Sequence, residues 1–590
     1  MSDKVRSNRD ILVSAQEKGI FATCFAYLRL SGPGWLQAAI TLGGGSLAGA
    51  LYLGILGGPK MLWLQLVAIV IGVIMLAAIS YVTLSTGKRP YHAINEHVNP
   101  VLGVGWITAT ILANMIWIIP QYSLSFDSLQ TSLGVGSDSV LSKILVSAVI
   151  GLLAFAFVAM SFLPGMLSKL FDLFLKLVIG TVVVCFVIAA YVIFKEGAIS
   201  WTEVLSGCIP NLSQWNNPAP EIQTLIDGLA ANNIDVANFW EEKVIEGQQS
   251  SIIGVTATAV GINMTFLLPY SMLARKWDKP FRGLARFDLI TALAIPYIIV
   301  MTCILITSAH AFHGKADAAL LNSDPAVIAT SNFFKGSKKN LIARYEISQS
   351  AEEVAALNEM EKAEQTTALA VFASELSEEE RKLAATVAKP NVKQLAVTLA
   401  PLLGEKNASL VFGIGALAMA FSTMIILMMI NGYAVAEVMG RYDSTGWRLV
   451  GALAACLVGF FWWVLWKDGQ ENWLGDSKTW LMIVASTFGA ILLPIAYVAF
   501  FALMNSRKLL GDAKPTGWRM VVWNVLMAIG VFGAFVQAVG AILTRAGDEA
   551  SGSFVIGGIA TFSLLALVGF SARFVGGNSA ERNSTEDGNE

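Results

Sequence analysis

Three consecutive glycines and a serine, Gly43-Gly44-Gly45-Ser46, interrupt a long apolar segment that carries no charge. Each glycine in a helix interior costs about 1 kcal/mol relative to alanine, so a helix is predicted to open at this run. In a bilayer, the backbone groups that such a break frees are tolerated only inside protein or beside a polar cavity. Ser46 is predicted to cap the half-helix that restarts, with N–H groups and a positive dipole end facing a ligand. We therefore expect a binding site here, with Thr41 at its start; close helix packing by small residues is the alternative.

A second break is predicted in the apolar segment 251–274, which contains Pro269. Proline lacks an N–H group and clashes with the carbonyl four residues back, so the helix is expected to break at Leu268–Ser271. Polar residues flank this position: Asn263, Thr265, Tyr270 and Ser271. Many transporters hold their substrate near the membrane midplane between two interrupted helices in corresponding positions of two inverted halves. The two breaks together predict such a site.

The elements that must position these residues are membrane-spanning helices. The 590-residue chain is 55% hydrophobic and 14% charged, and its mean hydropathy is +0.62. A soluble domain carries about 25% charged residues, so this is predicted to be an integral membrane protein. Apolar runs long enough to cross a bilayer recur twelve times, at 32–57, 61–86, 101–124, 142–163, 168–194, 251–274, 287–310, 407–437, 447–466, 479–504, 519–544 and 552–574.

Charge in the connecting loops predicts the orientation, because short cytoplasmic loops accumulate Lys and Arg. Basic residues concentrate in three loops, at 87–89, 275–286 and 507–514. The loops at 121–139 and 196–250 are acidic instead. This pattern predicts a plasma (inner) membrane protein with both termini in the cytoplasm.

The predicted organisation has two helical repeats and two insertions. Residues 351–388 of the second insertion mix apolar and charged residues at helical spacing, which predicts one or two external helices. Both insertions are expected to form an extracellular cap. The predicted units are a cytoplasmic tail at 1–30, five helices at 31–194, an insertion at 195–250, five helices at 251–504 with an insertion at 311–404, two helices at 505–575 and a disordered tail at 576–590.

Several short motifs, taken in order, resemble the Nramp metal-ion transporters. This resemblance covers most of the membrane portion and implies the LeuT-like, all-α fold of two inverted five-helix repeats, here with two further helices. The motifs are Gly32-Pro-Gly-Trp-Leu, Thr86-Gly87-Lys88 with Asn95-Glu96-His97, Val204-Leu205-Ser206-Gly207, Leu399-Ala-Pro-Leu-Leu-Gly404, and Leu493-Pro494 with Asn505-Ser506-Arg507-Lys508-Leu509-Leu510-Gly511.

The departures from the family pattern fall in the site itself. The family carries Asp-Pro-Gly-Asn and Met-Pro-His-Asn at its two breaks, and the resemblance places Gly43, Ser46 and Leu268 where its metal ligands stand. Leu492 stands for the helix-ten glutamine, so no carboxylate or thioether is expected at the site. Helix three lacks the family's acidic proton carriers and instead offers these lining candidates: Asn114, Gln121 and Tyr122.

These departures argue against a dehydrated transition metal as substrate, because such ions need carboxylate, imidazole or sulfur donors and an uncompensated divalent charge is costly to desolvate. We expect a secondary active transporter that moves a small ion or solute by alternating access, with membrane lipid around it and a coupling ion as a further partner. A largely hydrated cation, a small organic solute such as an amino acid, and a non-transporting sensor remain open. His310 and His313, near Asp317, are weak candidates for a metal site at the entrance. No enzyme activity, cofactor or nucleic-acid partner is expected, and the oligomeric state is left open.

Overall fold

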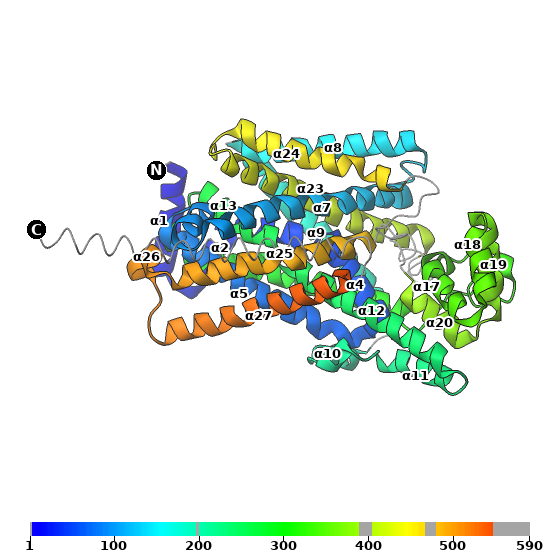
Figure 1. The fold of residues 1–590 in the computed structure, drawn as a ribbon. Helices are drawn as coiled ribbons and strands as arrows, with labels where there is room; N and C mark the ends of the chain where they lie inside the picture. Colours follow the sequence, from blue (N-terminus) through cyan, green and yellow to red (C-terminus); the bar gives the residue numbers. More distant parts are fainter. Residues whose placement is uncertain are drawn as a thin grey trace, which may run out of the picture.

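The computed structural model describes residues 3–388, apart from 164, 196, 198 and 199, together with residues 404–466 and 480–546. Within these ranges every regular element is a helix, and most of the helices form one bundle (Figure 1). Eleven of the twelve predicted spans coincide with helices of this bundle. The predicted span at 552–574 and the predicted tail at 576–590 lie outside the described residues.

The first repeat begins with an interrupted helix and continues with four long ones. Its helices are uncharged over most of their length, and Gly or a β-region residue ends or begins them where the chain turns. They are α3 (Pro33–Thr41), α4 (Gly44–Gly57), η1 (Gly58–Met61), α5 (Leu62–Thr86), the short α6 (Pro90–His97), α7 (Pro100–Leu133), α8 (Val140–Phe162) and α9 (Met166–Lys195).

The second repeat has the same design. Two short helical elements and one long helix follow it among the described residues. Its seventh predicted span contains a π-helical turn, η4 (Leu289–Ala294). The remaining helices are α12 (Ile234–Ala259), α13 (Ile262–Ala274), η3 (Lys279–Phe281), α14 (Arg282–Asp288), α15 (Ile295–Phe312), α23 (Glu405–Val438), α24 (Thr445–Phe460), η5 (Phe461–Trp466), α25 (Trp480–Asn505), α26 (Arg507–Leu510), η6 (Gly511–Ala513) and α27 (Trp518–Ala546).

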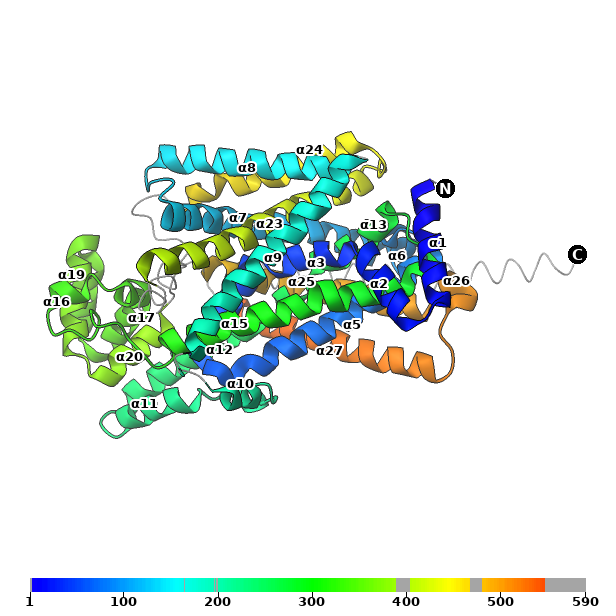
Figure 2. The same ribbon diagram turned by 180° about the vertical axis from the view of Figure 1, so that it is seen from behind.

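The two interrupted helices run in opposite directions through the bundle. The pair α3–α4 runs away from the end that carries the N-terminus, whereas α12–α13 runs toward that end (Figures 1 and 2). As a result α4 packs against α12 and α3 packs against α13. The two breaks therefore face each other between the repeats, as an inverted-repeat fold requires.

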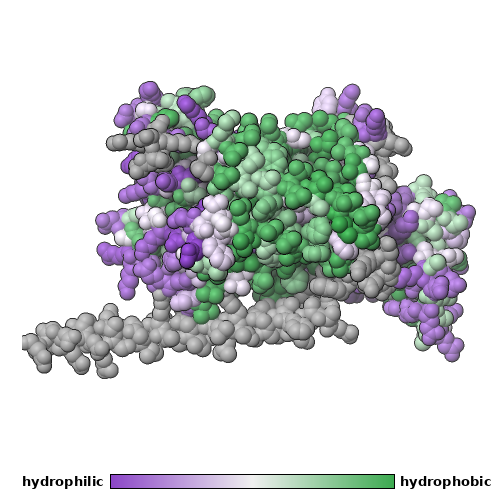
Figure 3. Space-filling view, turned by 90° about the horizontal axis from the view of Figure 1, so that it is seen from above, coloured by the Kyte–Doolittle hydropathy of each residue, from purple (hydrophilic) through white to green (hydrophobic). Residues whose placement is uncertain are grey.

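Apolar side chains cover the flank of the bundle, and polar side chains gather at its two ends (Figure 3). Leu152 on α8, Leu177 on α9 and Phe532 on α27 have exposed fractions of 69%, 62% and 71%. By length and composition, the described residues contain ten helical stretches able to cross a membrane; four of them, Gly44–Thr86, Ile234–Ala274, Lys279–Phe312 and Thr445–Leu465, join more than one element. Apolar exposure on this scale fits a lipid-facing surface. The chain is an integral membrane protein.

The two predicted insertions form a helical cap at one end of the bundle, opposite the N-terminus (Figure 1). The expectation of one or two helices in 351–388 is wrong, because there are three: Ser350 caps α18 in a capping box with Glu353, and Ser377 caps α20. The helices of the cap are α10 (Trp201–Gly207), η2 (Leu212–Trp215), α11 (Pro220–Ala230), α16 (Pro325–Ile328), α17 (Asn332–Ser348), α18 (Ala351–Glu359), α19 (Lys362–Glu375), α20 (Glu378–Val387) and the start of α12.

A buried ion pair joins three helices of the cap. The guanidinium of Arg344 on α17 donates to both carboxylate oxygens of Glu380 on α20, at 2.7 and 3.2 Å. The indole N–H of Trp240 on α12 donates to the same carboxylate at 3.0 Å. Arg344 and Glu380 are 6% and 7% exposed. Because α12 continues into the bundle, this cluster anchors the cap to the membrane portion.

The segment predicted as a basic tail contains two helices, α1 (Asp3–Glu17) and α2 (Ile20–Leu30). Along α2, Phe21, Phe25 and Leu28 follow a spacing of four and three residues, so they share one face. Their exposed fractions are 94%, 73% and 57%. An exposed apolar face on a short helix beside the bundle is typical of a helix that lies in the membrane interface.

A buried carboxylate holds the start of α3 where α2 ends. Asp288, which is 1% exposed, accepts hydrogen bonds from the N–H groups of Gly34 at 2.6 Å and Gly32 at 3.3 Å, and from the Ser31 hydroxyl. A negative charge at a helix N-terminus stabilises the helix through its dipole and its unpaired N–H groups. Asp288 thus fixes the first turn of α3 against α14 and the π-helical turn.

Candidate substrate-binding cavity

The first predicted break is confirmed, but it is shorter than expected. Helix α3 ends at Thr41 and α4 begins at Gly44, so Leu42 and Gly43 alone separate them. Gly43 occupies the N-cap position of α4 in an extended conformation, with no side chain to cap the helix. The expectation that Ser46 caps α4 is wrong, because Ser46 lies within the first turn of the helix.

The glycines also allow other helices to approach α4 closely. A Cβ atom on Gly44 would lie 2.7 Å from Oε1 of Gln121 and 2.8 Å from the sulfur of Met482. The Gly44 N–H group donates to that same Gln121 oxygen, at 3.2 Å. The glycine run therefore serves both of the roles that the sequence suggested, as a break and as a contact surface for α7 and α25.

The prediction of a second break at Leu268–Ser271 is wrong. Helix α13 continues through Pro269 to Ala274, and the interruption lies at Val260 and Gly261, between α12 and α13. Transmembrane helices tolerate an internal proline because neighbouring groups satisfy the freed carbonyl. A Cβ atom on Gly261 would lie 2.5 Å from the Trp117 ring, so this position favours glycine. The glycine, and not the proline, marks the break.

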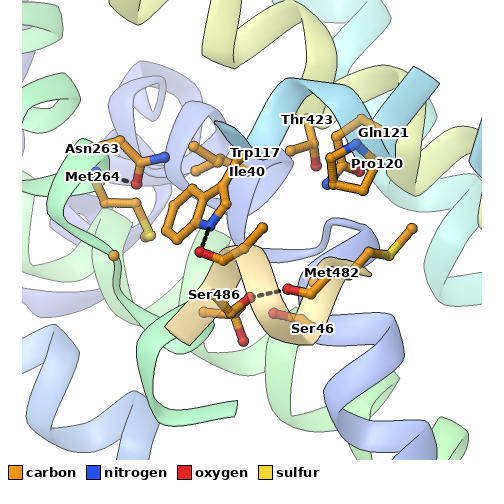
Figure 4. Close-up of a pocket in the computed structure, with 14 residues that line it drawn as sticks. Ile40, Ser46, Trp117, Pro120, Gln121, Asn263, Met264, Thr423, Met482 and Ser486 are labelled. Carbon is orange, nitrogen blue, oxygen red and sulfur yellow. Dashed lines mark hydrogen bonds between the residues drawn. The ribbon is translucent and has the colours of Figure 1, made fainter. Parts of the chain in front are cut away.

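A cavity of about 30 Å³ lies between the two breaks (Figure 4). It is large enough for one or a few water-sized groups. Residues from α3, α4, α7, α12, α13, α23 and α25, and from the second break, surround it: Ile40, Gly45, Ser46, Trp117, Pro120, Gln121, Thr258, Gly261, Asn263, Met264, Thr423, Met482, Ala485 and Ser486.

Four of the predicted site residues line this cavity: Gly45, Ser46, Gln121 and Asn263. Three others lie directly behind them. Thr41 donates to the Met264 sulfur at 3.1 Å, Gly44 bonds Gln121, and a Cβ atom on Gly43 would touch the Thr423 hydroxyl. The central part of the predicted site is thus assembled by the fold.

The remaining predicted residues do not line the cavity, and each contacts other parts of the bundle. Thr265 accepts from the Trp106 indole at 3.0 Å, and the Ser271 hydroxyl donates to the Leu268 carbonyl at 2.8 Å. Tyr270 stacks on Phe266, Asn114 bonds Asn431, Tyr122 contacts Cys456, and Leu492 packs against the apolar core.

Sequence reasoning missed the lining residues on α12, α23 and α25. Thr423 and Ser486 are buried polar residues in apolar spans, which is a signal for a functional position in a membrane helix. Thr258 is a threonine one turn before the second break. The expectation of no thioether at the site is wrong, because Met264 and Met482 line the cavity.

The cavity is neutral, since none of its lining residues is ionisable. Ser46, Gln121 and Asn263 are 3%, 4% and 0% exposed, so the polar lining is closed off from bulk solvent. Across the described residues, no group of three or more His, Cys, Asp or Glu side chains lies close enough to hold a metal ion.

The weak metal candidates near the cap have other partners. His313 bonds the Ile55 carbonyl at 2.8 Å through Nδ1, and its Nε2 lies 3.6 Å from Glu221. Asp317 accepts from the Ser331 hydroxyl and lies apart from this contact. Hydrogen bonding from His313 and the nearby Lys60 ammonium lower the pKa of Glu221 to about 2. This cluster is an ion-pair network on the cap side and not the predicted three-residue metal site at His310.

Comparison with protein families gives a match that spans most of the chain. Residues 34–329 and 365–539 match the model of the natural resistance-associated macrophage protein-like (Nramp) family. The chain belongs to the Nramp family. A comparison with curated protein sequences finds no match.

Solved Nramp structures share the fold of this chain. The manganese transporter of Eremococcus coleocola, in complex with an aromatic bis-isothiourea substituted compound, is 15% identical with a TM-score of 0.60, and the match covers 93% of this chain and 94% of that one. A histidine-to-alanine mutant of the same transporter is 14% identical with a TM-score of 0.56, over 92% and 93% of the two chains. Identity this low shows that this Nramp protein has the family fold; it does not transfer the substrate.

Proposed function

We propose that this Nramp protein is a secondary active transporter that moves a small solute by alternating access through the cavity between its interrupted helices. The observation that carries this proposal is the small cavity, lined by buried polar side chains among apolar ones, at the meeting point of α3–α4 and α12–α13. Unwound backbone at membrane depth is tolerated where it lines such a cavity, and inverted repeats rock around a site in this position. Solute flux into proteoliposomes, with and without a blocked cavity, tests it.

A sensor that binds a ligand without transport is the alternative from another class. It would bind its ligand in detergent yet give no flux that depends on the cavity. No observation on the described residues favours it over transport.

We further propose that Mn²⁺ and Fe²⁺ are not the substrates. Hard divalent ions require anionic oxygen ligands to offset the cost of losing water, whereas this cavity offers hydroxyls, amides and the two neutral thioethers of Met264 and Met482. The manganese transporter of E. coleocola shares the fold alone with this chain.

We expect calorimetry on the purified protein to detect no binding of Mn²⁺ or Fe²⁺ at micromolar concentration. Thioethers are soft ligands that prefer Cu(I), so they do not compensate for the missing carboxylate. The measurement is titration of each ion into the wild type and into Met264→Ala. Micromolar Mn²⁺ binding that Met264→Ala weakens would show that the cavity is a transition-metal site.

The proposed orientation places the cap outside the cell and both termini in the cytoplasm, as the charge of the loops predicts. Two native cysteines test it, since Cys208 follows α10 in the cap and Cys24 lies on α2; both are partly exposed. We expect a membrane-impermeant maleimide to label Cys208 in intact cells and Cys24 only after permeabilisation. The variants Cys208→Ser and Cys24→Ser assign the two signals, and the reverse pattern would invert the topology.

A further inference from the structure

We propose that the cavity recognises a hydrogen-bond-accepting, anionic group: a carboxylate carried by a very small solute, or a halide ion. This inference rests on the proposed function and names the class of substrate. The basis is the hydrogen bonding around the cavity, where some buried donors have no partner within the protein and other groups do.

Two side-chain donors at the cavity are buried and unpaired. The amide nitrogen Nδ2 of Asn263, a residue that is 0% exposed, has no hydrogen-bond partner, and neither does the Ser46 hydroxyl, in a residue that is 3% exposed. The Asn263 oxygen accepts from the Met264 N–H group at 2.9 Å, which fixes the orientation of the amide. In Figure 4 the nitrogen of Asn263 accordingly points away from Met264, toward Trp117 and Ile40. An unpaired buried donor costs about 1–3 kcal/mol, which a bound acceptor would recover.

Two helix N-termini meet at the same place. Helix α4, of 14 residues, begins beside the cavity at Gly44, and α13, of 13 residues, begins there at Ile262. Each N-terminus carries unpaired N–H groups and about half a positive charge, which favours a bound anion. The side-chain oxygen of Gln121 accepts from the Gly44 N–H group. The NH₂ group of the same side-chain amide is a further hydrogen-bond donor beside the cavity.

At the opposite helix ends, which would attract a cation, one carbonyl of each helix lies within hydrogen-bond distance of protein hydroxyls. The carbonyl of Ala39, near the end of α3, accepts from the hydroxyls of Ser422 and Thr423, both at 3.1 Å. The carbonyl of Ala259, the last residue of α12, accepts from the Thr41 hydroxyl at 3.4 Å. One carbonyl at each negative end thus has a hydroxyl neighbour. At the positive ends the N–H groups of Gly44 and Met264 are paired with Gln121 and Asn263, and the unpaired buried donors are the Asn263 amide and the Ser46 hydroxyl.

Two of the other lining hydroxyls already donate their protons to carbonyl groups of the protein. Ser486 donates to the Met482 carbonyl at 2.6 Å, and Thr258 donates to the Val255 carbonyl at 3.0 Å. What they present to the cavity is a neutral lone pair, which is a weak ligand for a cation and can receive a donor group of the solute. The balance of charge in the cavity therefore favours an acceptor bound at Ser46 and Asn263.

The size of the cavity restricts the solute further. A volume of about 30 Å³ suits groups of one to a few heavy atoms, such as chloride, formate, acetate or glycine. Larger carboxylic acids with several charged groups do not fit in the enclosed state. Size and hydrogen-bonding character thus select the same short series of probes.

The test is titration calorimetry with the full-length protein in detergent, against a sodium gluconate background. The probes are sodium chloride, sodium formate, sodium acetate and glycine, with magnesium gluconate as the cation arm. We expect at least one of the first four to bind and magnesium not to compete with it. Chloride binding without carboxylate binding assigns a halide, and the reverse assigns a carboxylate.

Asn263→Asp replaces the amide donor by a carboxylate of the same shape, so we expect the affinity for the anion to fall at least tenfold. Ser46→Ala removes only one hydroxyl, is tolerated sterically, and should weaken binding about two- to tenfold. The matched control is Asn217→Asp in the cap, an exposed asparagine that bonds Ser213, which should leave the affinity unchanged.

Binding of none of the four probes, which are three anions and the zwitterion glycine, would overturn the inference, as would magnesium binding that Asn263→Asp strengthens. The two proposals fail in different ways. Cavity-dependent flux of a cation would preserve the transporter and refute the anion site. Anion binding that depends on Asn263, without flux of any solute, would preserve the anion site and refute transport.

Discussion

Gly44→Leu is expected to abolish solute flux in proteoliposomes, to below a hundredth of the wild-type rate. The Cβ atom alone would lie within 3 Å of Oε1 of Gln121, the Met482 sulfur and a methyl group of Leu124, so these side chains of α7 and α25 would have to shift, and the rest of the leucine side chain would need further space. The new side chain also disrupts the hydrogen bond between the Gly44 N–H group and the Gln121 side chain at the start of α4. Overpacking of a well-packed core costs about 1–3 kcal/mol or more, and here it falls on the substrate site itself.

The measurement is uptake of labelled probe anions into vesicles that contain equal amounts of correctly folded protein. Gly180→Leu on α9 is the matched control, because a Cβ atom there meets nothing within 4 Å and the residue is exposed on the lipid-facing side. We expect that control to transport at the wild-type rate. Normal flux in Gly44→Leu would mean that the first break is not part of the substrate path.

Glu380→Gln is expected to destabilise the cap by about 3–5 kcal/mol, because it leaves the buried Arg344 charge without a counter-ion. Glutamine keeps the size of the side chain and one acceptor for the Trp240 indole, so the loss is mainly electrostatic. Hydrogen exchange with mass spectrometry should show protection factors of α17 and α20 that fall at least a hundredfold.

The control for this cluster is Glu378→Gln on the same helix. Glu378 pairs with Lys382 at 2.7 Å on the surface, with an exposed carboxylate side chain (59%). Exposed ion pairs contribute about 0–1 kcal/mol, so exchange in α17 should stay within about fivefold of the wild type. Equal exchange in the two variants would mean that the cap does not depend on the buried pair.

The positions of the spans could be predicted from the sequence because a membrane imposes a minimum apolar length on every helix. Gly43 marked the first break for a similar reason, since a run of glycines is unfavourable in any helix. The second break lies at Gly261 and not at Pro269, which the sequence favoured. A proline can remain in a membrane helix, whereas the contact of Gly261 with the Trp117 ring depends on tertiary packing that a single sequence does not reveal.

The same limit applies to the site. Ser46 and Asn263 could be predicted because each is a polar residue near a predicted break, and Gln121 because the family resemblance drew attention to the polar residues of helix three. Thr423 and Ser486 reach the cavity from helices far along the chain, and only the packing of α23 and α25 selects them. Pro269 placed the predicted second break at Leu268–Ser271, which begins seven residues beyond Gly261, about two helical turns. The predicted residues Thr265, Leu268, Tyr270 and Ser271 of α13 therefore lie outside the cavity, whereas Asn263 lines it.

The short junction between α2 and α3 couples the position of α3 to that of α2, whose exposed apolar face suits the membrane interface. Phe21, Phe25 and Leu28 give α2 an apolar underside, and the helix passes into α3 through the two residues Ser31 and Gly32. Any rotation of α3 must therefore drag α2 through the headgroup region as well as break the contacts that α3 makes with Asp288. Under the proposed alternating access, the stiffness and thickness of the surrounding lipid would enter the work of each cycle, and the host membrane would help to set its rate.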